Sequence, residues 1–124
     1  MIRYIVTGLG LVIAAVAAVA EFAPSESRRL AGLDDSFNES MERVRQGAAV
    51  QEDDLSSYGC YELGLLRNAA YARHGRVFEK PEYRDYFARQ PWYRPDPAFS
   101  DSRDMTYEDR ANVRRITGAE ERCR

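Results

Sequence analysis

The sequence has few of the residues from which metal sites and catalytic centres are usually built. It contains one histidine and two cysteines among 124 residues. Two cysteines cannot form a four-thiolate zinc site, and one histidine cannot supply the histidine pair of an HExxH metalloprotease. The GxSxG motif, which marks the nucleophile of many hydrolases, is also missing. We therefore expect neither a metal nor a cofactor, and the sequence assigns no catalytic residue.

Excess charge of one sign is missing too. The formal net charge is -2, although 31% of the residues are charged. Because such a balance leaves no broad basic surface, nucleic acid is not an expected partner. The length allows one small domain and an N-terminal segment, and a 44% share of hydrophobic residues is typical of a globular protein.

The first twenty residues are typical of a secretory signal peptide. Arg3 supplies a positive charge, residues 4–20 carry none, and Ala18 and Ala20 fit the A-x-A cleavage pattern. The alternative is an uncleaved membrane anchor, for which this uncharged run is at the lower limit of length. No cysteine follows that could carry a lipid. We expect a periplasmic or secreted protein that begins at Glu21 and has no membrane contact after cleavage.

Export changes how the two cysteines are interpreted. In an oxidising compartment an even pair is normally bridged, which predicts a disulfide between Cys60 and Cys123. The alternative is two free thiols. A bridge around so much of the chain would stabilise a small domain substantially.

Aromatic residues and charge divide the chain near residue 55. Residues 58–124 hold seven tyrosines, three phenylalanines and Trp92, whereas residues 21–57 hold two phenylalanines and a surplus of acids. We therefore predict an acidic linker over residues 21–54 and a helical domain over residues 55–124.

Within the acidic segment, apolar residues recur at helical spacing. They favour a short amphipathic helix with Asp35 or Ser36 as N-cap and Gly47 as its stop, and a solvated linker is the alternative. The spaced residues are Leu33, Phe37, Met41 and Val44.

The C-terminal part predicts three helices and no strand. The first covers residues 58–73, with Ser56 or Ser57 as cap and Gly75 as a left-handed stop. Its apolar face comprises Leu65, Leu66, Ala69, Ala70 and Ala72.

The second helix starts at Pro81 and ends near residue 89, with Tyr83, Tyr86 and Phe87 packing inward. A long loop pinned by aromatic side chains covers residues 92–105. Thr106 and Asp109 form a possible capping box that opens the third helix, through Val113 and Ile116. The expected fold is a small all-α, three-helix domain closed by one disulfide.

Several segments together resemble the YARHG domain family. They are LLRNAAYARHGRVF at residues 65–78, Tyr86-Phe87, Pro91-Trp92-Tyr93, Pro95-Asp96, Asn112-Val113 to Ile116, and Glu120. The family is named for the pentapeptide at residues 71–75, and the resemblance covers about residues 55–121. It implies an extracytoplasmic bacterial domain and implies no reaction.

The pentapeptide region supplies the first candidate ligand contacts. On a helix, Arg67, Tyr71 and His74 can share one stripe, with Arg73 beside them. His74 is interpreted either as a general base or ligand contact, or as a structural group that satisfies backbone atoms at the helix end together with Asn68 and Arg73. If His74 were a general base, nearby acids could act as its partner, but none has a spacing that specifies a His–carboxylate pair. These acids are Glu62, Glu79 and Glu82.

Two further groups have a functional and a structural interpretation. Trp92 and Tyr93 could stack against a ligand, or they belong to the core. Four arginines could form an anion-binding patch or pair with nearby acids. The arginines are Arg67, Arg73, Arg76 and Arg84, and the acids are Glu62, Glu79, Glu82 and Asp85.

The sequence therefore predicts an exported, non-enzymatic binding or interaction module of the cell envelope, with an envelope polymer or protein as partner. One alternative is a small hydrolase or peptidoglycan-modifying factor that uses His74 as base. Another is an accessory domain that stabilises or inhibits a partner protein through the helix of Phe37 and Met41.

Overall fold

The computed structural model describes the backbone of residues 24–124 and the side chains of residues 34–124. The predicted signal peptide, residues 1–20, lies outside the described residues. The chain divides into two compact units, Met1–Asp34 and Asp35–Arg124. In the first unit the structure describes only helical backbone from Pro24 onward, so the following paragraphs concern the second.

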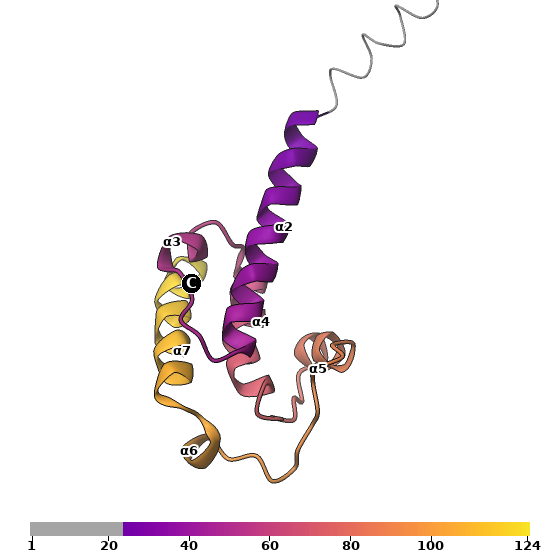
Figure 1. Ribbon diagram of the computed structural model, residues 1–124, viewed down its shortest axis with the longest axis vertical. Helices are drawn as coiled ribbons and strands as arrows, with labels where there is room; N and C mark the ends of the chain where they lie inside the picture. Colours follow the sequence, from indigo (N-terminus) through magenta and orange to yellow (C-terminus); the bar gives the residue numbers. More distant parts are fainter. Residues whose placement is uncertain (1–23) are drawn as a thin grey trace, which may run out of the picture. The chain divides into compact units, whose positions relative to one another are not determined.

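Residues 24–124 contain six α-helices, a final 3-10 turn and no strand, which confirms the all-α prediction (Figure 1). The elements are α2 (Pro24–Arg45), α3 (Glu52–Leu55), α4 (Cys60–Ala72), α5 (Pro81–Ala88), α6 (Asp101–Asp104), α7 (Tyr107–Glu120) and η1 (Glu121–Cys123). Over this part of the chain, no helix combines the length and apolar character that crossing a membrane requires.

The core is built around α4, which packs along α7 (Figure 1). Leu63, Leu66, Ala69 and Ala70 of α4 are fully buried, as is Ile116 of α7. The side chains expected to form the apolar face of this helix are therefore inside. Burial of each leucine stabilises the fold by roughly 1.5–3 kcal/mol.

The C-terminal half of α2 also contributes to this core. Val44 is fully buried and Met41 nearly so. Phe37 packs edge-on against Tyr58, with ring centres 5.6 Å apart. Residues that the sequence assigns to a linker thus form part of the hydrophobic core. Phe37 and Met41, which the sequence offers as a docking surface for a partner, pack within this domain instead.

The predicted N-cap of this helix at Asp35 or Ser36 is wrong. The helix begins at Pro24 and runs through both positions. The Ser36 hydroxyl instead hydrogen-bonds the Tyr58 hydroxyl at 2.7 Å. Gly47, with φ of 74°, follows the end of α2 as predicted, because glycine adopts this left-handed conformation without steric cost.

The predicted cap of α4 at Ser56 or Ser57 is also wrong. Residues Glu52–Leu55 form the short helix α3, and Ser56 donates its hydroxyl to the Asp53 carbonyl at 2.8 Å. The N-cap of α4 is Gly59. At the other end Gly75 has φ of 94°, which confirms it as the left-handed residue after the helix.

The other two predicted helices are confirmed. Pro81 occupies the first turn of α5, and Thr106 and Asp109 form a full capping box at the start of α7. The loop between them contains the short helix α6, and its Asp96 N–H donates to the Gly75 carbonyl at 2.7 Å. That bond ties the long loop to the end of α4.

The predicted disulfide between Cys60 and Cys123 is present. It joins the first residue of α4 to the last residue of η1, directly after α7. The start of α4 therefore lies beside the end of α7, so the two helices run antiparallel. The disulfide joins the two helices at one end. At the other end they are joined by the bonds of Asp109 with Arg73 and His74.

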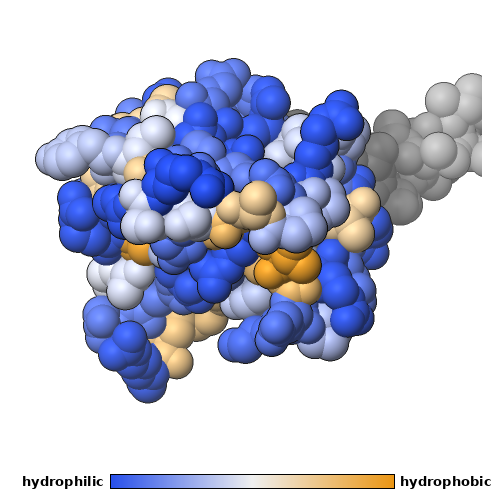
Figure 2. Space-filling model, turned by 90° about the horizontal axis from the view of Figure 1, so that it is seen from below, coloured by the Kyte–Doolittle hydropathy of each residue, from blue (hydrophilic) through white to orange (hydrophobic). Residues whose placement is uncertain are grey.

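One face of the molecule is mostly hydrophilic (Figure 2). Hydrophobic residues appear on it as small separate spots rather than as one continuous patch. Single exposed apolar residues are normal for a globular protein.

Candidate functional site

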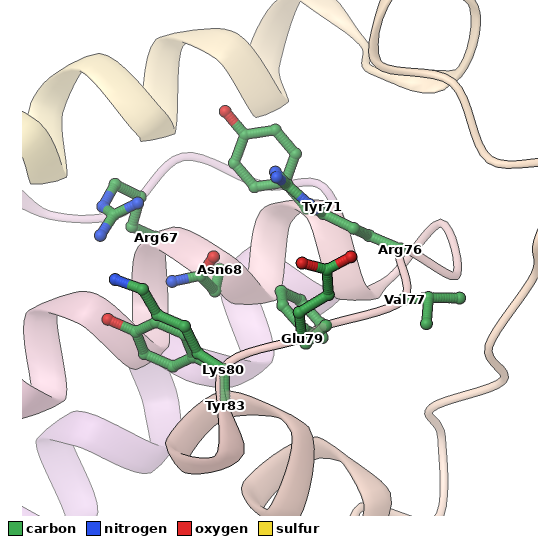
Figure 3. Close-up of a pocket in the computed structure, with 9 residues that line it drawn as sticks. Arg67, Asn68, Tyr71, Arg76, Val77, Glu79, Lys80 and Tyr83 are labelled. Carbon is green, nitrogen blue, oxygen red and sulfur yellow. The ribbon is translucent and has the colours of Figure 1, made fainter.

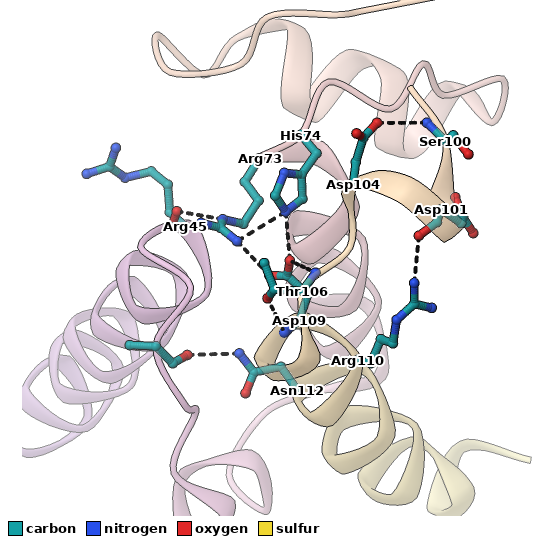
Figure 4. A network of polar contacts seen from close by, with 11 residues as sticks. Arg45, Arg73, His74, Ser100, Asp101, Asp104, Thr106, Asp109, Arg110 and Asn112 are labelled. Atoms are coloured by element: carbon teal, nitrogen blue, oxygen red, sulfur yellow. Dashed lines mark hydrogen bonds and ion pairs between the residues drawn. The ribbon is translucent and has the colours of Figure 1, made fainter. Parts of the chain in front are cut away.

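A buried carboxylate organises the junction between α4 and α7. The Asp109 side chain has no exposed surface, and its Oδ1 lies 2.8 Å from Arg73 Nη1. Its Oδ2 lies 2.7 Å from His74 Nε2 and accepts the Thr106 backbone N–H at 2.8 Å (Figure 4). Asp109 is therefore both a member of the capping box of α7, in which Thr106 is the N-cap, and the partner of two residues from the pentapeptide.

Hydrogen bonds keep this buried carboxylate charged. Burial raises the pKa of Asp109, but the bonds from Thr106, His74 and Arg73 outweigh it and hold the pKa below its ordinary value. A buried charge without such partners would be strongly destabilising. Arg73 and His74 thus have a structural task.

Arg73 connects a third element to the cluster. Its Nε donates to the Arg45 backbone carbonyl at the end of α2, at 3.0 Å (Figure 4). Helix ends leave carbonyls without intrahelical partners, and the guanidinium supplies one. Nearby, Asn112 bridges the following segment, since its Nδ2 donates to the Ala48 carbonyl and its Oδ1 accepts the Val50 N–H.

The sole histidine uses its Nε2 in this cluster. The carboxylate of Asp109 can only accept, so Nε2 carries the proton and donates to Asp109. The 3.1 Å approach of Arg73 Nη1 to the same nitrogen is then a contact between two donors. The side chain of His74 remains 20% exposed. Nε2 is thus engaged with a carboxylate that also belongs to the capping box of α7, and within the described residues the other ring nitrogen, Nδ1, makes no hydrogen bond.

A second candidate site is a pocket of about 510 Å³ beside the segment that joins α4 to α5 (Figure 3). Its lining is mostly polar and combines cationic side chains with tyrosines. The lining residues are Arg67, Asn68, Tyr71, Arg76, Val77, Phe78, Glu79, Lys80 and Tyr83. Of the predicted ligand contacts, Arg67 and Tyr71 are in this pocket, whereas Arg73, His74, Trp92 and Tyr93 are not among its lining residues.

The cations of this pocket are held in different ways. Arg67 Nε lies 2.6 Å from Glu120 Oε1, which pairs this arginine with α7. The guanidinium carbon of Arg76 lies 4.7 Å from the centre of the Tyr71 ring. Lys80 Nζ lies 6.0 Å from the centre of the Tyr83 ring. Both are within the range of a cation–π contact.

Arg76 and Lys80 keep their charge available. Among residues 34–124, no ion pair within 4.0 Å includes either of them. Of the four arginines considered as a patch, Arg67, Arg73 and Arg84 are paired with acids, and Arg76 is not. The pocket therefore presents two cations that an anionic group can reach.

Asn68 adds a hydrogen-bond acceptor to the pocket. Its Nδ2 donates to the Gly64 carbonyl at 2.8 Å, which fixes the orientation of the amide. Within the described part of the chain Oδ1 accepts no bond, and no fully buried side-chain polar atom lacks a partner. The Oδ1 atom therefore keeps some exposed surface, although Asn68 as a whole is only 6% exposed, and the residue lines the pocket.

Trp92 and Tyr93 belong to an aromatic cluster. Trp92 packs edge-on against the buried Phe87, with ring centres 5.9 Å apart. Tyr93 packs against Phe78 and donates its hydroxyl to the Arg76 carbonyl at 2.6 Å. Both rings are half-buried and pack against the hydrophobic core, as the structural interpretation of these two residues expects.

Sequence reasoning missed Lys80 and Tyr83 as pocket residues and missed the bond of Asp109 to His74. Two features of the sequence could have drawn attention to Lys80. It is the single lysine among 18 basic residues, and it directly precedes Pro81, which starts a helix. For Asp109 the capping box located the residue, but not its partners on α4.

Comparison with known proteins identifies the family of this chain. The YARHG domain family model matches residues 40–121. A crystal structure of "a putative nutrient binding protein" from Legionella pneumophila is similar to this chain, with 35% sequence identity and a TM-score of 0.51. The similarity covers 55% of this chain and 21% of that chain, so it spans about a fifth of the Legionella protein. No curated protein matches the chain. Because the family model spans more than half of the sequence, the chain belongs to the YARHG domain family, a family of extracytoplasmic domains.

Proposed function

We propose that this protein is a periplasmic or secreted binding module, without enzymatic activity, that recognises an anionic group of a cell-envelope component. The ligand contacts the pocket between α4 and α5 through Arg76 and Lys80. The contact surface expected from the sequence was a stripe of Arg67, Tyr71 and His74. The pocket includes Arg67 and Tyr71 but not His74.

The observation that carries the proposal is the availability of two cations in a concave site. Arg76 and Lys80 have no acidic partner among the described residues, although the chain has more acids than bases. Ligand pockets are typically concave and have a few placed polar groups, and a volume of about 510 Å³ is in their usual range. A positive site on a protein of net charge -2 indicates selection of an anion.

Two further observations support a binding role outside the cytoplasm. The Legionella structure that resembles this chain is titled as a nutrient-binding protein. The disulfide agrees with an oxidising compartment outside the cytoplasm.

Titration of solubilised cell-wall fragments into the naturally processed protein tests the proposal. We expect binding that weakens with salt and is reduced about tenfold in Lys80→Gln, the value of one charge-assisted hydrogen bond. Arg84→Gln is the matched control, because Arg84 is exposed, lies outside the pocket and pairs with Asp85. Absence of binding, or equal binding by the wild-type protein and Lys80→Gln, would contradict the proposal.

A further inference from the structure

We propose that the pocket accommodates a short zwitterionic peptide of dipeptide size, and that it recognises both charged ends. This inference rests on the proposed function and specifies the ligand. The peptide carboxylate binds beside Lys80, and the peptide ammonium binds beside Glu79.

The two ends of the pocket differ in charge. Figure 3 shows the charged ends of Arg67 and Lys80 and the Tyr83 hydroxyl on one side, and the Glu79 carboxylate on the other. Arg67 is close enough to the Tyr83 hydroxyl for the two to interact electrostatically, and Lys80 lies at the Tyr83 ring. A carboxylate placed here meets cations and a hydroxyl donor. An ammonium group suits the opposite side, because Glu79 is in no ion pair with another described residue.

Asn68 lies between the two ends in the close-up (Figure 3). Its amide is fixed by the bond from Nδ2 to the Gly64 carbonyl, so Oδ1 can act only as an acceptor. A peptide N–H between the two charged ends would satisfy this oxygen. The guanidinium of Arg76, held over the Tyr71 ring, can donate to the peptide carbonyl.

This set of groups distinguishes a peptide from a simple anion. Sulfate, for example, has no hydrogen to donate, so it would leave Asn68 Oδ1 unsatisfied and place negative charge near Glu79. A single amino acid has no peptide N–H for Asn68. The volume of about 510 Å³ exceeds what one small amino acid needs and accommodates two residues with their side chains.

Calorimetry with three related probes tests the inference on the naturally processed protein. The probes are dialanine, N-acetyl-dialanine, which lacks the ammonium, and dialanine amide, which lacks the carboxylate. We expect dialanine to bind best, and each blocked form to bind about tenfold more weakly, the effect of losing one charge-assisted hydrogen bond.

Variants at two acids identify the ammonium site. Glu79→Gln should reduce the affinity for dialanine to that for N-acetyl-dialanine and should not weaken binding of the acetylated probe, because only dialanine has an ammonium for this carboxylate. Glu82→Gln is the control, since Glu82 is also exposed and acidic but does not line the pocket. Far-ultraviolet circular dichroism establishes that each variant is folded.

Four outcomes would overturn the inference. Equal affinity for dialanine and N-acetyl-dialanine would show that no ammonium is recognised, and an equal effect of Glu79→Gln on both probes would show the same. If all three probes fail to bind while cell-wall fragments bind in a Lys80-dependent manner, the peptide assignment is wrong and the proposed function stands. If neither probes nor fragments bind, both are wrong.

Discussion

Arg73 and Asp109 join the end of α4 to the start of α7, with Nη1 2.8 Å from Oδ1. The disulfide between Cys60 and Cys123 joins the opposite ends of the same two helices. The antiparallel pair at the centre of the domain is thus closed by a buried ion pair at one end and by a covalent bond at the other. The YARHG pentapeptide, which supplies Arg73 and His74, is explained largely by the first of these closures.

Asp109 should make stability depend on acid pH. Its pKa is lowered in the folded protein, so its stabilising contribution is complete above the ordinary carboxyl value of about 4 and is lost as pH falls through the lower folded value. Asp104 acts in the same direction, because bonds from Arg103 and the Ser100 N–H lower its pKa to about 2. Urea unfolding at a series of pH values should show a plateau near neutrality and a decline below about pH 4.

Asp109→Asn should lower the free energy of unfolding at pH 7 by about 3 kcal/mol, because Arg73 loses its buried charged partner. The same substitution should flatten the acid decline. Asp85→Asn is the control, since this exposed pair with Arg84 should contribute less than about 1 kcal/mol. Equal stability of the two variants would refute the structural role of the buried carboxylate.

Two glycines should respond to alanine with opposite signs. At Gly75, φ is 94° and a Cβ atom would lie 2.8 Å from the Arg94 carbonyl oxygen, so Gly75→Ala should destabilise by about 2 kcal/mol. In the last turn of α7, a Cβ at Gly118 meets nothing within 4 Å, and Gly118→Ala should stabilise by roughly 0.5 kcal/mol. Thermal unfolding of the two variants checks both signs, and a stable Gly75→Ala would contradict the described turn.

Removal of the disulfide should be costly. Its two cysteines are 63 positions apart, and in the chain-entropy model a loop of this length is worth about 4 kcal/mol. Cys60→Ser combined with Cys123→Ser should therefore lower the urea midpoint strongly. Reduction of the wild-type protein should produce the same shift, and two alkylatable thiols in untreated protein from outside the cytoplasm would disprove the bridge.

The sequence predicted the helices wherever local signals were strong. Pro81 at the start of α5, the Thr106–Asp109 capping box and Gly75 after α4 each act within a few residues, and each was located correctly. The caps of α2 and α4 were misplaced because Ser36 and Ser56 have other partners, the Tyr58 hydroxyl and the Asp53 carbonyl. A serine near a helix indicates a possible cap but does not identify the group that it contacts.

The candidate site could be predicted only in part, because it depends on contacts between distant residues. Arg67 and Tyr71 share a face of α4, which helical spacing indicates, but Lys80 and Tyr83 reach the same pocket from α5 and the segment before it. His74 was assigned to the stripe of Arg67 and Tyr71. Its bond to Asp109, which is 35 positions away, has no local signature.

The central claim is that ligand binding occurs in the pocket at Arg76 and Lys80, whereas His74 maintains the fold. The most direct test is calorimetric titration of cell-wall fragments into the wild-type protein, Arg76→Gln and His74→Gln, with stability measured in parallel. We expect His74→Gln to unfold more easily and to bind as the wild-type protein does, and Arg76→Gln to keep its stability and bind about tenfold more weakly. Weakened binding by folded His74→Gln, together with wild-type binding by Arg76→Gln, would contradict the account.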